Sequence, residues 1–176
     1  TSRHQLFLAR YASDGRLLSS LSLANSPQFR FMSMIEGPDG DLYIYGSYST
    51  QVQFLEANDF FRISNGETFG GSFIARISKA GELRWAISLG SVTVAGGISI
   101  GPDGTIYVAG SFEEEGDFDP GTEEVIFTPD FGSSDLYLAA YSAEGNYLWS
   151  KERSIEFGGF SSYVATDEQD AVYWVY

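Results

Sequence analysis

Residues 98–112 read ISIGPDGTIYVAGSF, in which two apolar, β-rich runs flank a Gly-Pro-Asp-Gly turn. Proline presets the backbone at one corner of such a turn and Asp-Gly supplies the reversal, so the stretch predicts a β-hairpin. Residues 37–48 read GPDGDLYIYGSY and repeat this text 64 positions upstream. A weaker copy stands at residues 167–176, with TDEQD at 166–170 in place of the turn. We align this third turn as one residue longer, and because it lacks Pro and Gly we expect it to be looser.

A second hairpin alternates with the first. Its turn glycines are Gly15, Gly81 and Gly145, which recur at nearly the same spacing as the first hairpin. Each copy predicts a strand, a short turn that ends in glycine and a second strand, with glycine supplying a positive φ. The connections at residues 47–72 and 111–136 are equal in length. Connections this long usually carry structure of their own, so we expect short strands within them, at residues 60–63 and 124–128.

Two hairpins in every period of 64 to 66 positions make four strands per repeat. Four antiparallel strands per repeat are typical of a β-propeller blade, whereas an extended β-sandwich shows no internal repeat. We therefore predict an all-β fold, a β-propeller made of four-stranded antiparallel blades. The prediction divides a single repeat array, residues 1–176, into a half blade (1–24), two complete blades (25–90 and 91–151) and a second half blade (152–176).

The two half blades add up to one, which makes about three blades in all, and closed propellers hold about four to eight. We therefore expect the array to belong to a longer chain or to an assembly. Half blades leave strand edges without partners, and such edges readily pair with other strands. The expected partners are other propeller blades, protein partners, or further copies of the chain joined through the half-blade edges.

The repeat text resembles the SBBP-type bacterial β-propeller repeat, over essentially the whole chain. The likeness is carried by the second hairpin, by the Gly-Pro-Asp-Gly hairpin and by DFDPG at residues 117–121. Residues 81–90 are similar to the pyrroloquinoline-quinone-type repeat, and residues 101–109 to the NHL repeat. The resemblance implies blade architecture and an exported or cell-surface bacterial protein, with a periplasmic location as a further alternative.

Charge and composition narrow the class of partner. The net charge is −14, and residues 87–150 hold 11 acidic residues without any Lys or Arg. Such a surface repels phosphate backbones and anionic lipids, so we expect neither nucleic-acid binding nor membrane binding. No apolar run approaches the ~20 residues of a membrane helix, so we expect no membrane insertion. The chain has no cysteine, which excludes disulfides and thiolate metal sites.

One acidic segment, EEEGDFDPG at residues 113–121, carries a candidate metal site. Hard oxygen ligands on a glycine-containing loop suit Ca²⁺, and we name Glu115, Asp117 and Asp119 as candidate ligands. The alternative is a solvated acidic loop with an Asp-Pro-Gly turn. Two observations favour the alternative: the spacing differs from that of an EF-hand, and the aligned loop at residues 51–58 keeps only Glu56.

We find no catalytic residues. His4 is the only histidine and lies before the first expected strand, so a Ser-His-Asp arrangement is not expected. Trp85 and Trp149 hold equivalent positions, for which packing between blades is the main interpretation and carbohydrate stacking the alternative. Arg10 and Arg76 are also equivalent and are expected on a polar strand face beside acidic residues.

These observations predict a non-enzymatic structural or protein-interaction module, with no cofactor apart from the candidate Ca²⁺. The alternative is a fragment of a propeller enzyme, either a quinone-dependent dehydrogenase or a hydrolase. In that case the catalytic residues would lie outside this chain.

Overall fold

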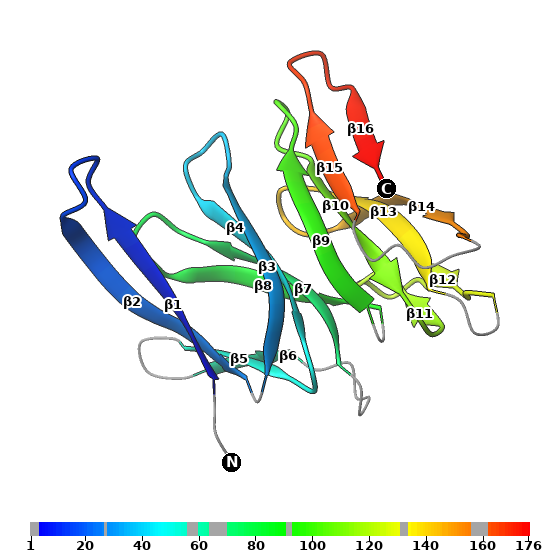
Figure 1. Ribbon diagram of the computed structural model, residues 1–176, viewed down its shortest axis with the longest axis horizontal. Helices are drawn as coiled ribbons and strands as arrows, with labels where there is room; N and C mark the ends of the chain where they lie inside the picture. Colours follow the sequence, from blue (N-terminus) through cyan, green and yellow to red (C-terminus); the bar gives the residue numbers. More distant parts are fainter. Residues whose placement is uncertain are drawn as a thin grey trace.

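The chain contains strands and turns but no helix over the residues that this computed structural model describes, which are 4–26, 28–55, 60–63, 70–90, 93–130, 134–155 and 162–176. Figure 1 labels the strands in chain order. Their bounds are β1 His4–Tyr11, β2 Leu17–Ser26, β3 Phe29–Glu36, β4 Leu42–Tyr48, β5 Val52–Leu55, β6 Phe60–Ile63, β7 Gly71–Ile77, β8 Leu83–Leu89, β9 Thr93–Ile100, β10 Ile106–Phe112, β11 Gly116–Asp117, β12 Ile126–Phe127, β13 Asp135–Tyr141, β14 Tyr147–Arg153, β15 Tyr163–Thr166 and β16 Val172–Val175.

Three four-stranded antiparallel sheets make up most of the structure. One contains β3, β4, β7 and β8 in that order, and another contains β9, β10, β13 and β14. The third joins β1 and β2 to β5 and β6, while β11–β12 and β15–β16 form two-stranded sheets.

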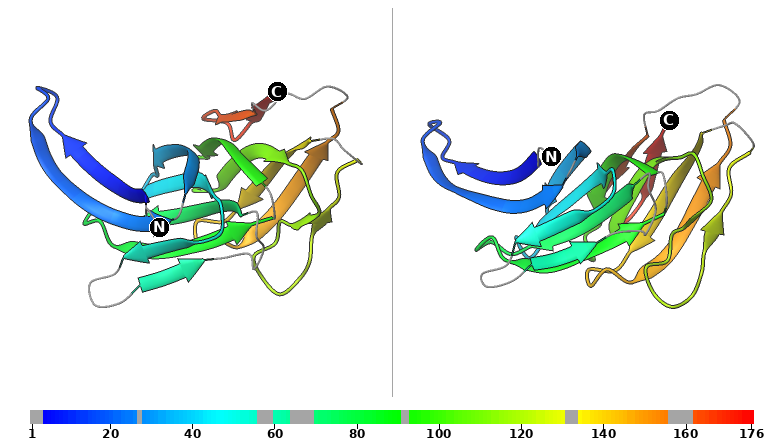
Figure 2. Two further views of the ribbon diagram at one scale, coloured as in Figure 1. Left: turned by 60° about the horizontal axis from the view of Figure 1, so that its bottom comes forward. Right: turned by 90° about the horizontal axis from the view of Figure 1, so that it is seen from below.

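The sheets stand in a row. The strands β3, β9 and β15 have the same position in successive repeats, and β9 contacts both of the others (Figure 1). Two further views show the β1–β2 hairpin at one end of the row (Figure 2). Over the described part of the chain, the sheets form an open row and no closed ring.

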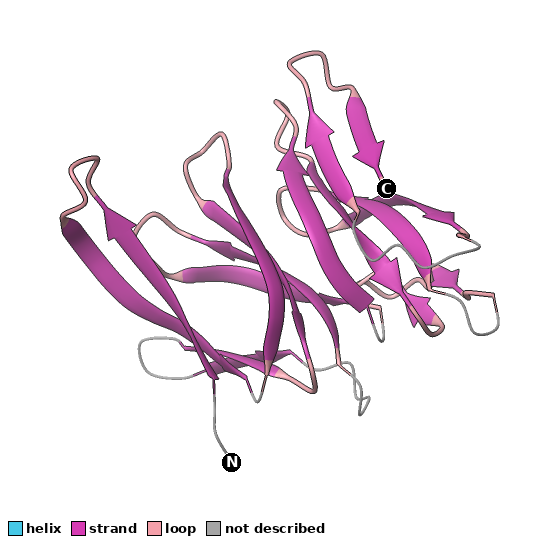
Figure 3. Cartoon of the chain, in the orientation of Figure 1, coloured by secondary structure: helices cyan, strands magenta, loops and turns pink. Residues whose placement is uncertain are grey.

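The prediction of an all-β fold with four-stranded antiparallel sheets is confirmed (Figure 3). No helix that could cross a bilayer occurs among the described residues.

The Gly-Pro-Asp-Gly turns join β3 to β4 and β9 to β10. In the first, the amide of Gly37 donates to the carbonyl of Asp41, and that of Gly40 donates to the carbonyl of Gly37, both at 2.9 Å. Gly40 has a φ of 77°, which an L side chain rarely adopts. The second turn repeats both hydrogen bonds, at 2.8 and 2.9 Å.

The third copy of this turn corrects the expectation of a loop that is one residue longer, although its two backbone hydrogen bonds are longer than those of the other copies. The amide of Asp167 donates to the carbonyl of Ala171 at 3.1 Å, and that of Asp170 donates to the carbonyl of Asp167 at 3.3 Å, as in the other copies. Asp170 takes the positive φ, at 62°. The predicted length was wrong because aspartate tolerates this region, and because the carboxylate of Asp167 accepts the amides of Gln169 and Ala171 at 2.9 and 3.0 Å.

Short hairpins fill the two long connections. The strand β6 coincides with the one expected at residues 60–63, and β12 lies inside the range expected at 124–128, so both expectations are confirmed. The destination of the first hairpin was not foreseen. In it β5 pairs with β2, with Ala24 opposite Phe54 and Asn25 opposite Gln53. A hairpin inserted between β4 and β7 therefore extends the sheet of the preceding repeat.

Equivalent aromatic side chains build the core of both complete repeats. In the first, Phe54 packs edge-on against Phe73, with ring centroids 5.6 Å apart. In the second, Phe118 packs against Tyr137 at 4.7 Å. All four side chains are fully buried. Because Phe54 and Phe118 belong to the inserted segments, burial of an aromatic ring fixes each insertion in the core.

Candidate functional site

The acidic loop that was predicted to bind Ca²⁺ follows β10. The carboxylate of Asp117 accepts the amides of Asp119 and Val125, both at 2.9 Å. The carboxylate of Asp119 accepts the amide of Gly121 at 2.8 Å. The bonds to the amides of Asp119 and Gly121 are those of Asx turns, whereas the bond to Val125 spans the loop. Both carboxylates therefore shape the loop to which they belong.

Glu115, the third candidate ligand, is exposed, and its carboxylate accepts the hydroxyl of Thr128 at 3.1 Å. No group of three or more His, Cys, Asp or Glu side chains over the described ranges is placed to hold a metal ion. The bonds of Asp117 and Asp119 support the solvated-loop interpretation. Binding of Ca²⁺ at Glu115, Asp117 and Asp119 stays a prediction.

Phe118 anchors this loop between two repeats. Its carbonyl accepts the hydroxyl of Tyr141 at 2.8 Å, within its own repeat. The neighbouring carbonyl of Asp117 accepts the amide of Gly90, at the end of the preceding repeat, also at 2.8 Å. The sequence carried a signal for this anchor, since phenylalanine recurs at positions 54 and 118 of the aligned insertions. The residues of the loop thus connect neighbouring sheets.

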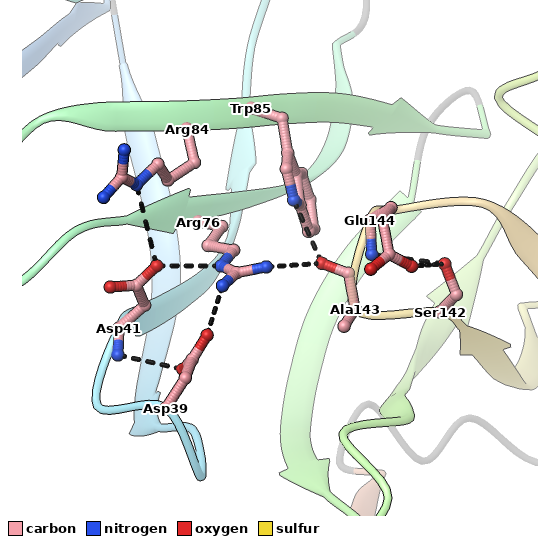
Figure 4. Close-up of polar contacts among 8 residues, drawn as sticks. All are labelled: Asp39, Asp41, Arg76, Arg84, Trp85, Ser142, Ala143 and Glu144. Carbon is pink, nitrogen blue, oxygen red and sulfur yellow. Dashed lines mark hydrogen bonds and ion pairs between the residues drawn. The ribbon is translucent and has the colours of Figure 1, made fainter.

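A polar junction that the sequence did not reveal lies between the sheet that contains β7 and β8 and the sheet that contains β13 and β14. Figure 4 shows its side chains. Arg76 on β7 donates from Nε to Asp41 at 3.0 Å and from Nη1 to the carbonyl of Ala143 at 3.1 Å. Its Nη2 donates to Asp39, in the Gly-Pro-Asp-Gly turn. The Nε of Arg84 also lies 3.8 Å from Asp41. Arg76 therefore ties a turn of its own sheet to a turn of the next.

The neighbours of Arg76 stabilise the charged form of its guanidinium. Burial disfavours the guanidinium, but the hydrogen bond to Asp41 and the fields of Tyr43 and Asp39 outweigh it and raise the pKa of Arg76. The guanidinium lies 5.5 Å from the centre of the Tyr43 ring, within the range of a cation–π contact. The expectation that Arg76 pairs with acidic neighbours is confirmed, whereas its equivalent Arg10 is exposed.

Trp85 completes the junction from β8. Its indole N–H donates to the same Ala143 carbonyl at 3.1 Å (Figure 4). Its ring also lies against Gly145 of that turn. A Cβ atom placed on Gly145 would lie 3.3 Å from the ring. Packing between repeats is therefore confirmed for Trp85. Trp149, at the equivalent position, packs on Tyr107 with ring centroids 5.9 Å apart.

The equivalent junction one repeat later has different chemistry. Ala140 stands where the earlier repeat has Arg76, and Thr105 stands in place of Asp41. Asp103 accepts the amide and the hydroxyl of Thr105 at 2.9 and 2.8 Å, which lowers the pKa of Asp103. Among the described residues, the network of Arg76 is therefore not repeated at this next junction.

Buried hydroxyl groups add a further link between sheets. Tyr45 on β4 and Tyr137 on β13 share a hydrogen bond between their hydroxyl oxygens. Burial raises the pKa of Tyr137 to about 12 and raises that of Tyr45 well above its ordinary value. Both hydroxyls are therefore neutral at physiological pH, and their placement is suited to holding the sheets together. His4 is the first residue of β1, and its side chain lies outside the described part of the chain.

Comparison with known proteins adds one distant likeness. No protein-family model matches the chain. Among curated proteins, it is similar to a protein named regulatory protein FlaEY, from Caulobacter vibrioides. The two are 27% identical over 141 residues, which is 79% of this chain. The match spans only 14% of the length of that curated relative.

Proposed function

We propose that the chain is a non-enzymatic module of β-propeller blades, with a structural or protein-interaction role in an exported or cell-surface bacterial protein. One observation carries the proposal: the second strand of a glycine-turn hairpin packs on the glycine turn of the next sheet, and this contact occurs twice. Leu21 on β2 lies beside Gly81, and Trp85 on β8 lies beside Gly145. A contact that recurs with each repeat lets successive sheets stack as blades do. The location rests on the resemblance to SBBP-type repeats alone.

The polar side chains described above make structural hydrogen bonds, which favours a structural role over an enzymatic one. Asp117 and Asp119 cap their own loop, and Arg76 connects two turns. The buried tyrosines have raised pKa values and stay protonated at neutral pH. Each of these groups is engaged in holding loops or sheets, which is the work of a structural module.

The charge distribution favours a basic protein as the partner. Residues 87–150 carry 11 acidic residues and no Lys or Arg, and this stretch includes the exposed loop after β10. An acidic surface speeds association with basic proteins and disfavours nucleic acid, and salt weakens both effects. We therefore propose protein partners with a basic contact surface.

Binding to a matched pair of probes tests the proposal. The immobilised chain is exposed to cytochrome c, which is rich in lysine, and to the same protein after lysine acetylation. We expect binding of the unmodified probe that weakens as salt is added, and clearly weaker binding of the acetylated one. Equal binding of both probes, or none of either, would contradict a preference for basic partners.

Addition of pyrroloquinoline quinone with Ca²⁺ tests the enzyme alternative. A quinone site in this chain would quench tryptophan fluorescence and raise the melting temperature. We expect neither change, and a saturable quench would favour the dehydrogenase fragment over the proposal.

A further inference from the structure

The edge of β1 that faces away from β2 has no paired strand among the described residues. Two large side chains of this strand, Phe7 and Tyr11, are 59% and 60% exposed. An apolar groove of about 260 Å³ runs beside the strand, between Leu8 and Leu23 on one side and Ile44 on the other. The edge therefore offers both unpaired backbone groups and an apolar surface to an incoming strand.

The strand β16 has a matching free edge. It pairs with β15 alone over the described ranges, and Tyr173 and Val175 are 55% and 64% exposed. By the repeat, β16 has the position of β4 and β10, and β1 has the position of β7 and β13. In both complete sheets these two positions are neighbours, because β4 pairs with β7 and β10 pairs with β13.

The repeat also predicts the register of such a pairing. Tyr43 stands opposite Arg76 in the first complete sheet. Their equivalents are Tyr173 on β16 and Arg10 on β1. Moving two residues along each strand then places Val175 opposite Leu8.

The side chains at these positions are complementary. In the existing pair, the guanidinium of Arg76 lies 5.5 Å from the centre of the Tyr43 ring. Arg10 is exposed, and Tyr173 donates its hydroxyl to the carboxylate of Asp167 at 2.8 Å. Opposite Tyr173, Arg10 would meet both an aromatic face and an acidic turn.

We propose that β16 of a second copy of the chain pairs antiparallel with β1, so that the β15–β16 hairpin of one copy extends the β1–β2–β5–β6 sheet of the other. The proposal rests on the proposed blade architecture. Since each copy carries both edges, two copies can satisfy them reciprocally about a twofold axis. Two copies of the chain would then hold six blades, three from each, within the range of about four to eight found in closed propellers.

Disulfide trapping tests the register, because the chain has no cysteine of its own. The Leu8→Cys/Val175→Cys variant puts one thiol on each edge at positions that the repeat predicts to be opposite. Ala9→Cys/Val175→Cys is the matched control, since a shift of one residue moves the side chain to the other face. We expect a disulfide-linked dimer from the first variant and little from the second. Equal dimer yields from both, or an oxidised monomer, would overturn the proposal.

Light scattering during size-exclusion chromatography tests the assembly itself. We expect a mass twice that of one chain at high concentration. Val175→Lys should raise the dimer dissociation constant about tenfold, which is ~1.4 kcal/mol, and Ile126→Lys, an exposed β-branched residue on β12, should leave it unchanged. A monomer at every concentration, or equal effects of both variants, would overturn the pairing. The packing of Trp85 on the turn that contains Gly145, on which the blade proposal rests, lies within one chain and is measured separately by the variants described below.

Discussion

The indole N–H of Trp85 donates a 3.1 Å hydrogen bond to the carbonyl of Ala143, a residue 58 positions further along the chain and in the next sheet. The same carbonyl accepts Arg76 at 3.1 Å. One backbone oxygen in a turn thus receives two side chains from the preceding repeat. Because a carbonyl oxygen has two lone pairs, it can accept both bonds.

Trp85→Phe should lower the free energy of unfolding by about 1 kcal/mol, because an aromatic ring is kept while the hydrogen bond to Ala143 is lost. Trp149→Phe is the matched control, since Trp149 has the equivalent position and packs on Tyr107. Urea denaturation measures both variants. Equal losses would mean that the bond to Ala143 contributes nothing particular to stability.

Arg76→Met should cost about 2 kcal/mol, because it leaves Asp39 without its cation, leaves Asp41 with the longer ion pair to Arg84 alone, and removes one donor to Ala143. Asp41 is only 8% exposed, so water cannot fully replace the lost bond. Arg10→Met, at the exposed equivalent position, should change stability by less than about 0.5 kcal/mol. The prediction fails if the two substitutions destabilise the chain to the same extent.

A comparison of the stability losses caused by Gly145→Ala and Gly15→Ala distinguishes backbone strain from a clash with the Trp85 ring. The two glycines have φ values of 85° and 84°, so each substitution should cost about 1 kcal/mol of strain. A Cβ atom on Gly15 meets nothing within 4 Å, whereas one on Gly145 lies 3.3 Å from the Trp85 ring. We therefore expect the larger loss of thermal stability for Gly145→Ala. The difference should shrink when Trp85 is also replaced by alanine, and a difference that persists would exclude the ring as its cause.

Stability should fall in strong base. Burial raises the pKa of Tyr137 to about 12, whereas an unfolded tyrosine titrates at its ordinary value near 10. Because the folded state keeps the tyrosine proton more tightly than the unfolded state, the free energy of unfolding has its full value below pH 10. It falls as the pH rises through about 12. Ultraviolet titration of tyrosinate should show Tyr45 and Tyr137 ionising only together with unfolding, as followed by circular dichroism. Ionisation of every tyrosine before unfolding would contradict this.

Asp117→Ala should cost about 1 kcal/mol, because the amides of Asp119 and Val125 lose their acceptor. Asp117→Asn keeps an acceptor oxygen and should cost much less. Under the solvated-loop interpretation, Ca²⁺ leaves the melting temperature of all three proteins unchanged. A rise in the wild type that Asp117→Asn abolishes would instead establish the Ca²⁺ site.

The repeating text predicted most of the strands because turns are local. The Gly-Pro-Asp-Gly turns and the glycine turns of the second hairpin each reverse the chain within a few residues. The apolar runs on the two sides of such a turn are therefore expected to be strands of matching length. The third turn was misjudged for the same reason. Asp170 adopts a glycine-like φ there because the carboxylate of Asp167 caps the loop, and a pattern of residue types does not show that bond.

The contacts between repeats could not be predicted in the same way. Arg76 reaches Ala143 only because the stacking of two sheets brings together residues 67 positions apart. The sheet that β5 joins likewise depends on the three-dimensional arrangement, because β5 pairs with β2 of the preceding repeat. Packing between blades was anticipated for Trp85, since tryptophan recurs at the equivalent position 149. The carbonyl that it meets has no sequence signature, because every residue carries one.

The pairing of β5 with β2 means that sheet and repeat are out of phase, because one period of sequence supplies strands to two sheets. A gene that gains or loses repeats by recombination must then respect the sequence period, whichever sheet the encoded strands join. A breakpoint placed at a sheet boundary would separate the hairpin from the strand that receives it. The heritable unit of such an array is the sequence period, and the β1–β2–β5–β6 sheet is completed only when two neighbouring periods are present.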